Sequence, residues 1–136
     1  MKIVIDTNIL MAGLLKNSIV REILLSKNID FFIPYQAIEE IKKYKKYLCK
    51  KSSYNEEEFE ILLNYLLENI KTVPKIKIKA YMAEAEKIMK IIDINDSSFI
   101  ATCFSINADG IWSFDKHFQK QNEIKIFDIK EVIKLF

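Results

Sequence analysis

Hydrophobic residues follow two patterns along the chain, short apolar runs and longer stripes with helical spacing. The runs are short enough for buried strands and occupy residues 2–5, 31–33, 111–113 and 125–127, with a further short strand possible at 71–73. Apolar positions three or four residues apart predict helices from about residue 9, over 18–27, 35–51, 55–70, 77–92 and 96–107, and after residue 128. Strands that alternate with helices predict an α/β fold with a parallel sheet. Because no linker or repeat divides the chain, residues 1–136 are expected to form a single domain.

Local signals mark several of the predicted boundaries. Ser18 is a predicted helix N-cap, and Pro34 is expected to end the second strand. Asn55 and Glu58 fit a capping box, in which each side chain accepts a hydrogen bond from the other residue's backbone N–H. The two long helices that flank this point are therefore expected to form a hairpin.

Acidic residues follow the ends of two predicted strands. Asp6 comes directly after the first strand, within the stretch IDTN, and Asp115 follows the strand that contains Trp112. In an open parallel sheet, ligands bind beyond the carboxyl ends of the strands, where loops and helix N-termini converge. The two acidic side chains are therefore expected at the same edge of the sheet.

Two further acids belong to predicted helices, and their angular positions decide whether they can reach that edge. Each helical residue advances about 100°, which puts Glu40 roughly 75° from the centre of its helix's apolar stripe and Glu39 nearly opposite that stripe. The same arithmetic places Asp96 in line with Phe99 and the apolar residues that follow it. Glu40 and Asp96 can therefore face the crevice, whereas Glu39 is expected to face solvent.

Four carboxylates in one place constrain the chemistry of the site. Their mutual repulsion would raise their pKa values and destabilise the fold unless a cation lies among them, and we identify no Arg or His in the sequence for that role. Hard oxygen ligands of this kind suit Mg²⁺ or Mn²⁺ and not Zn²⁺. A divalent ion held in this way can activate water and neutralise charge that develops on a phosphodiester.

These acids, in this order, resemble the acidic quartet of PIN-domain ribonucleases, the group that includes VapC-type toxins. The resemblance extends over essentially the whole chain and rests on four contexts: Asp6 in IDTN, Glu40 in PYQAIEEI, Asp96 in DINDSSFIA and Asp115 in IWSFDKHF. Three supporting positions also fit the family pattern, namely Asn8, Asp93 and Ser113. One departure is the polar pair at 97–98, where small apolar residues are usual, and it concerns packing rather than chemistry.

The resemblance implies a three-layer α/β/α domain with a mainly parallel sheet, and a metal-dependent endoribonuclease that hydrolyses RNA to leave a 5′-phosphate and a 3′-hydroxyl. In that family Asp6, Asp96 and Asp115 would hold one or two Mg²⁺ or Mn²⁺ ions. Glu40 would bind a metal or orient water, and Asn8 would help to support the carboxylates and the phosphate, together with Ser113. A homodimer is also implied, and an antitoxin protein is the implied partner if the chain is a toxin.

Simpler interpretations of the same residues stay open. Asp6 and Asp96 could be helix N-caps, and Glu40 could be a solvated partner of Lys43. The single histidine, His117, is expected to be structural or close to the substrate rather than a general base, because a metal ion removes the need for one. The main alternative function is a catalytically silent RNA-binding or scaffold module on the same fold, although such a module would have no reason to bury repelling charges.

Composition and charge add little to this interpretation. The net charge of +2 at pH 7 is too small to indicate nucleic-acid binding by itself, but Lys residues concentrate between 42 and 51. There Tyr47 could stack on single-stranded RNA, whereas Tyr44 lies on the apolar stripe. Cys49 and Cys103 show no CxxC spacing and no secretory leader precedes them, so free thiols and a cytoplasmic location are expected. No apolar run approaches the roughly 18 to 20 residues of a membrane span.

Overall fold

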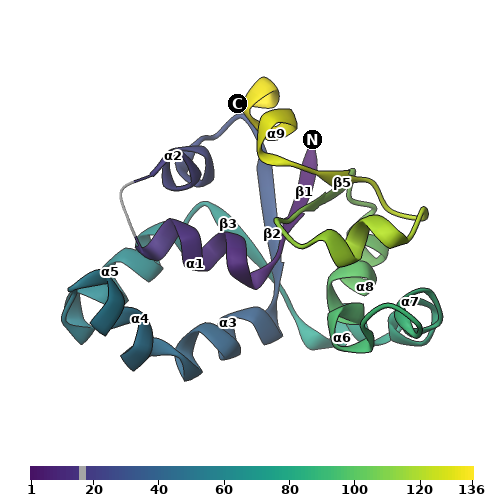
Figure 1. The fold of residues 1–136 in the computed structure, drawn as a ribbon, viewed down its shortest axis with the longest axis horizontal. Coiled ribbons are helices and arrows are strands. Elements are labelled where there is room, and N and C mark those ends of the chain that lie inside the picture. Colours follow the sequence, from purple (N-terminus) through teal and green to yellow (C-terminus); the bar gives the residue numbers. More distant parts are fainter. Residues whose placement is uncertain (16–17) are drawn as a thin grey trace.

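Five parallel strands form the centre of the molecule, which we describe from a computed structural model that covers residues 1–15 and 18–136 (Figure 1). The strands pair in the order β3-β2-β1-β4-β5, and all four pairings are parallel. Their bounds are β1 (Lys2–Ile5), β2 (Asp30–Pro34), β3 (Ile70–Val73), β4 (Gly110–Trp112) and β5 (Ile126–Phe127). The predicted sheet, including the short strand near residue 71, is therefore confirmed.

Helices cover both faces of this sheet. Figure 1 shows α1 to α5 on one side and α6 to α8 on the other, which confirms the three-layer α/β/α arrangement. The α-helices are α1 (Thr7–Leu15), α2 (Ile19–Leu25), α3 (Tyr35–Lys43), α4 (Lys45–Ser52), α5 (Glu56–Leu67), α6 (Lys75–Lys79), α7 (Met82–Met89), α8 (Ser97–Ile106) and α9 (Ile129–Leu135). Two short 3₁₀ helices, η1 (Ile94–Asp96) and η2 (Lys116–Lys120), lie beside the site described below.

After the exposed Lys2, the central strand β1 is apolar because it is buried on both faces. Ile3, Val4 and Ile5 are each fully buried, as expected for an inner strand of a parallel sheet with helices on either side. Trp112, next to β1 on β4, is also fully buried, and its ring lies 6.0 Å from that of Phe31 on β2. The first polar residue after β1 therefore emerges from the middle of the core.

Gly110 at the start of β4 permits the close approach of β5. A Cβ atom at this position would lie 2.6 Å from the Cε2 atom of Phe127 and closer still to the carbonyl oxygen of Lys125. Contacts this short would force the backbone to move. Glycine is therefore required here for β4 and β5 to pair, and β4 leads directly into the functional site.

The predicted caps are present. The hydroxyl of Ser18 accepts a hydrogen bond from the backbone N–H of Arg21, and the reciprocal hydrogen bonds between Asn55 and Glu58 complete the capping box of α5. Asp128 caps α9 in the same way. These local signals fix where three helices begin.

The helix predicted over residues 35–51 is interrupted at Tyr44, which separates α3 from α4 with φ −93° and ψ 11°. The surrounding run KKYKK offers no aliphatic side chain to hold a straight helix against the core. After the bend, Leu48 and Cys49 are buried, and α4 packs against α1. The expectation that Tyr44 lies on the buried stripe was wrong, because its side chain is 45% exposed.

Two other helices are shorter than predicted. α5 ends at Leu67, because the side-chain amide of Asn69 donates hydrogen bonds to the carbonyl oxygens of Leu24 (2.8 Å) and Ser26 (2.7 Å) and turns the chain into β3. The helix predicted over 77–92 begins at residue 75 and is divided into α6 and α7. At the division, the backbone N–H of Tyr81 donates to the carbonyl oxygen of Ile78 (2.9 Å), which ends α6 in a tight turn.

Candidate active site

A cavity of about 230 Å³ lies at the carboxyl edge of the sheet. Four acids line it, and each comes from a different part of the chain: Asp6 after β1, Glu40 on α3, Asp96 at the end of η1 just before α8, and Asp115 after β4. Parallel strands deliver the first and last of these to the same edge, and two helices supply the others. The structure therefore brings together the four acids that the sequence singled out.

Asp6 is the most buried member of this group, with only 4% of its surface exposed. Its Oδ1 atom accepts a hydrogen bond from the backbone N–H of Ile9 (3.0 Å), so it caps α1 as well as lining the cavity. Burial raises the pKa of Asp6, and the charge of Asp115 adds to this effect. The hydrogen bonds from Ser113 and Ile9 oppose the rise by stabilising the ionised form.

Ser113 connects two of the acids without lining the cavity itself. Its hydroxyl donates a hydrogen bond to Oδ2 of Asp6 and accepts one from the backbone N–H of Asp115 (2.8 Å). Ser113 is buried, so both hydrogen bonds are shielded from water. The residue therefore fixes the end of β4 relative to the end of β1, as a supporting position would.

Asp96 lies at the N-terminus of α8 and makes no capping hydrogen bond there. It is half-buried, and its pKa is raised to about 6, mainly by burial and further by the negative charges of Asp93, Asp115 and Asp6. The N-cap interpretation of this residue is therefore not supported. Its carboxylate lines the cavity and remains free to accept a ligand.

Glu40 reaches the cavity although it is an exposed residue. Its Oε2 atom accepts a hydrogen bond from the hydroxyl of Thr7 (3.1 Å), which ties α3 to the start of α1. Among the described residues, Glu40 has no ion pair with Lys43, the partner that the simpler interpretation suggested. Asn8 is exposed and also lines the cavity, and Glu39 does not line it.

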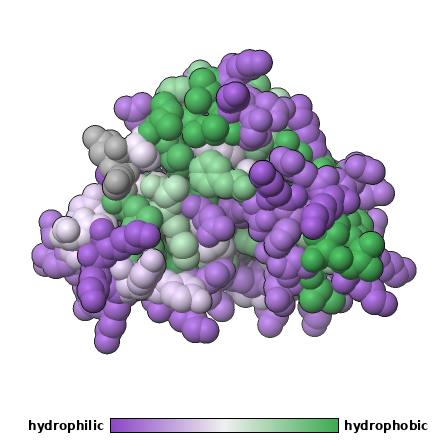
Figure 2. Space-filling view, viewed as in Figure 1, coloured by the Kyte–Doolittle hydropathy of each residue, from purple (hydrophilic) through white to green (hydrophobic). Residues whose placement is uncertain are grey.

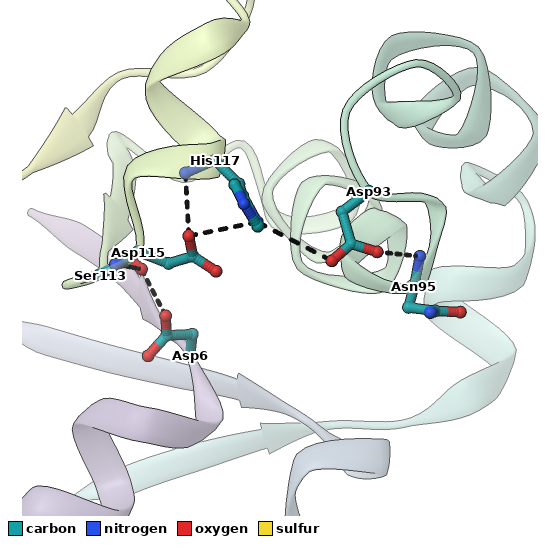
Figure 3. Close-up of polar contacts among 6 residues, drawn as sticks. All are labelled: Asp6, Asp93, Asn95, Ser113, Asp115 and His117. Carbon is teal, nitrogen blue, oxygen red and sulfur yellow. Dashed lines mark hydrogen bonds and ion pairs between the residues drawn. The ribbon is translucent and has the colours of Figure 1, made fainter.

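His117 lies between Asp115, which lines the cavity, and Asp93, as Figure 3 shows. Its Nδ1 atom is 3.4 Å from Oδ1 of Asp115 and 3.9 Å from Oδ2 of Asp93. Asp93 caps η1 through the backbone N–H of Asn95 (3.1 Å). The expectation that no histidine is available to the acids was therefore wrong. The angular positions of residues on predicted helices could not place His117, because it lies in the short 3₁₀ helix η2.

The charge around the cavity remains strongly negative. In residues 1–15 and 18–136, no Lys or Arg nitrogen lies within 4.0 Å of the four acids, and His117 is the basic side chain that approaches them. The donor set is made of carboxylate oxygens, which suits Mg²⁺ or Mn²⁺. The residues present therefore fit a divalent ion of this class.

Sequence reasoning missed several residues that shape the cavity. Thr7 holds Glu40, Gln36 and Asn95 contribute polar walls, and Phe118 lines the cavity with its ring edge to face against that of Phe99, the residue already expected in line with Asp96. Thr7 could have been found, because it stands inside IDTN between two residues that were already identified. The others have no local signal, since their positions depend on how distant elements pack.

Comparisons with known proteins support the family and the fold. A family model described as PIN domain matches residues 4–125. Among solved structures, a chain of VapBC2 from Rickettsia felis, solved bound to a DNA fragment from the VapBC2 promoter, is similar to the protein with a TM-score of 0.72 and 18% sequence identity, over 94% of this chain and 98% of that chain. The comparison with curated proteins gave no match. None of the described helices is long and apolar enough to cross a membrane.

Proposed function

The chain belongs to the PIN domain family, whose members are generally nucleases, and we propose that it is a metal-dependent endoribonuclease that hydrolyses phosphodiester bonds in RNA. The observation that carries the proposal is the convergence of four carboxylates in one cavity at the carboxyl edge of the sheet. A catalytically silent module would gain nothing from gathering charges that repel one another, because each buried carboxylate costs desolvation energy.

Each acid has a distinct part in this proposal. Asp6, Asp96 and Asp115 would hold one or two Mg²⁺ or Mn²⁺ ions, and Glu40, held by Thr7, would orient the attacking water or complete the ligand set. An ion bound there would lower the pKa of water and offset charge that develops on the phosphate. Ser113 would keep the Asp6 carboxylate in place, and Asp93 lies next to the group as an additional acid.

The exposed side chain of Asn8 lines the cavity and can donate hydrogen bonds from its amide nitrogen. A phosphate oxygen next to the carboxylates would need such a donor, because the carboxylates themselves only accept. Asn8 would therefore help to hold the phosphodiester, and its position at the second residue of α1 places it at the positive end of that helix dipole.

The region of α4 provides a surface suited to single-stranded RNA. Tyr47 is 58% exposed, the Nζ atom of Lys51 lies 5.7 Å from its ring centroid, and most lysines between residues 42 and 51 are exposed. Figure 2 shows hydrophilic side chains along the lower rim of the molecule, over α3 and α4. Stacking on the tyrosine and phosphate contacts to the lysines would guide RNA towards the cavity.

An antitoxin partner and a homodimer are further parts of the proposal. The similarity in fold to a chain of a VapBC2 structure supports a toxin–antitoxin pair. The free, buried thiols of Cys49 and Cys103 fit a cytoplasmic location. A gene for a small antitoxin-like protein next to the gene for this chain, and co-purification of the two products, would support the toxin role over one in RNA processing.

Cleavage of single-stranded RNA in the presence and absence of divalent ions tests the activity. We expect cleavage with Mg²⁺ or Mn²⁺, no cleavage in excess chelator, and recovery when the ion is restored. The products should carry a 5′-phosphate and a 3′-hydroxyl. RNA that is bound but left intact with either ion would support the silent RNA-binding module instead.

A further inference from the structure

Next to the cavity, and sharing Asp96 with it, is a second group of possible ligands, which differs in chemistry from the main acidic group. Ligand atoms of Asp93, Asp96 and His117 all lie within 4.8 Å of one another, and this group does not include Asp6 or Asp115. It combines two carboxylates with an imidazole nitrogen. Figure 3 shows His117 and Asp93 facing each other across the gap between η2 and η1.

The observed separations suit ligands of one ion better than a direct hydrogen bond. His117 Nδ1 and Asp93 Oδ2 are 3.9 Å apart, which exceeds hydrogen-bond distance. Ligand atoms that are each about 2.1 Å from one ion lie between about 3.0 and 4.2 Å from each other, depending on the angle at the metal. The pair could therefore bind the same ion with small side-chain adjustments.

The local structure leaves these side chains accessible, and the nearest other acid is Asp115, whose Oδ1 atom lies 3.4 Å from Nδ1 of His117. The backbone N–H of Asn95 binds Oδ1 of Asp93, so the carboxylate is held in place while Oδ2 faces the imidazole. Asp96 makes no capping hydrogen bond at α8. His117 is about half exposed, so an ion from solvent can reach its ring. The hydrogen bond from Asn95 to Asp93 is the kind of contact that orients a ligand in metal sites.

We propose that Asp93, Asp96 and His117 form a cation site that takes Mn²⁺ or a similar first-row transition ion in preference to Mg²⁺. Imidazole nitrogen binds transition ions well and Mg²⁺ poorly, whereas carboxylates alone discriminate little between Mg²⁺ and Mn²⁺. The site extends the proposed metal chemistry to a second ion position that shares Asp96 with the first. It does not depend on RNA cleavage, and its test measures metal binding.

The test uses the fact that His117 is the only histidine in the chain. Pulsed electron paramagnetic resonance of protein-bound Mn²⁺ detects a nitrogen coupling when an imidazole binds the ion directly, and ¹⁵N labelling of histidine assigns that coupling without any mutation. We expect the coupling in the unmodified protein at Mn²⁺ concentrations that fill the acidic sites. Its absence there would overturn the proposal.

Variants separate ligation from a structural role of the imidazole. In His117→Gln we expect the coupling to disappear and Mn²⁺ affinity at this site to fall at least about 10-fold, while Mg²⁺ affinity changes by less than about threefold. Gln119→Ala, an exposed neighbour on η2, is the matched control and should change neither. Equal losses for both ions in His117→Gln would contradict the preference. Asp6→Asn should keep the nitrogen coupling, because Asp6 does not belong to this site. Absence of RNA cleavage would contradict the nuclease proposal, and absence of the nitrogen coupling would contradict this one.

Discussion

The hydroxyl of Ser113 donates a hydrogen bond to the buried carboxylate of Asp6. These residues are 107 positions apart in the sequence, and they meet because β1 and β4 are neighbours in the parallel sheet. The same hydroxyl accepts a hydrogen bond from the backbone N–H of Asp115. One side chain thus orients two of the proposed metal ligands, and the sheet pairing is what makes this possible.

Ser113→Ala removes both hydrogen bonds and should weaken metal binding. Loss of a residue that orients a metal ligand typically costs about 10- to 100-fold in metal affinity or activity, and we expect a loss in that range. Titration calorimetry with Mn²⁺ measures it directly. Ser105→Ala, which removes a hydroxyl from α8 at a distance from the cavity, is the control. Equal Mn²⁺ affinity in the two variants would contradict the role assigned to Ser113.

Glu40→Gln tests whether α3 contributes to the chemistry. The amide keeps the size of the side chain and can still accept the hydrogen bond from Thr7, so folding should be unaffected. We expect the rate of RNA cleavage to fall by about 10²- to 10³-fold, as for loss of a charged group in a preorganised site. Glu39→Gln changes the adjacent residue, which does not line the cavity, and should leave the rate unchanged. A similar rate in both variants would place Glu40 outside the site.

The raised pKa of Asp96 predicts a specific dependence of stability on pH in the presence of chelator. The folded protein binds this proton more tightly than the unfolded chain does, with a pKa of about 6 against 3.8. The stabilisation is therefore complete below about pH 4 and is lost as the pH rises through about 6. Asp96→Asn has no carboxylate to ionise, so it does not lose stability in this way as the pH rises. The stability of Asp96→Asn minus that of the unmodified protein should therefore be larger at pH 7.5 than at pH 4.5.

Urea unfolding at these two pH values, in excess chelator, measures the effect. Asp30→Asn, an exposed residue at the opposite end of β2, serves as the control for loss of a negative charge. For each pH, the free energy of unfolding of Asp96→Asn is compared with that of the unmodified protein. If this difference is the same at both pH values, Asp96 does not titrate in this range. Added Mn²⁺ should stabilise the unmodified protein more at pH 7.5 than at pH 4.5, because protons compete for the carboxylate.

Gly110→Ala tests the packing that positions Ser113 and Asp115. The added methyl group would clash with Phe127 and with the backbone of Lys125, and overpacking of this kind costs typically about 1–3 kcal/mol. Urea unfolding should show a loss of that size. Ala108→Gly, just before β4, is the control for a change at the same turn that adds no volume. An unchanged stability of Gly110→Ala would mean that β4 and β5 can separate without cost.

Residues close to strand ends could be predicted from the sequence, whereas contacts between distant side chains could not. Asp6 and Asp115 follow apolar runs, and the carboxyl ends of parallel strands lie at one edge of the sheet. The proximity of these two acids could therefore be predicted from the sequence. Glu40 and Asp96 followed from helical angles. The position of His117 between two acids depends on a turn whose sequence has no hydrophobic periodicity, so only the structure shows it.

The errors in helix prediction have a related cause. The spacing of Tyr44 fits the apolar stripe of a continuous helix, but the chain bends there so that α4 can pack against α1. Similarly, Asn69 ends α5 through hydrogen bonds to residues of a different helix and the turn after it. In each case a tertiary contact overrides a local pattern that is otherwise sound.

The most direct test of the central claim, that the acids at the sheet edge form a metal-dependent ribonuclease site, is the rate at which Asp6→Asn cleaves single-stranded RNA at saturating Mg²⁺ or Mn²⁺. Asp30→Asn is the matched control, and circular dichroism establishes that both variants are folded. We expect Asp6→Asn to cut at least about 100-fold more slowly than the unmodified protein, and Asp30→Asn to cut at its normal rate. A folded Asp6→Asn protein that cuts RNA as fast as the unmodified protein would contradict the proposed site.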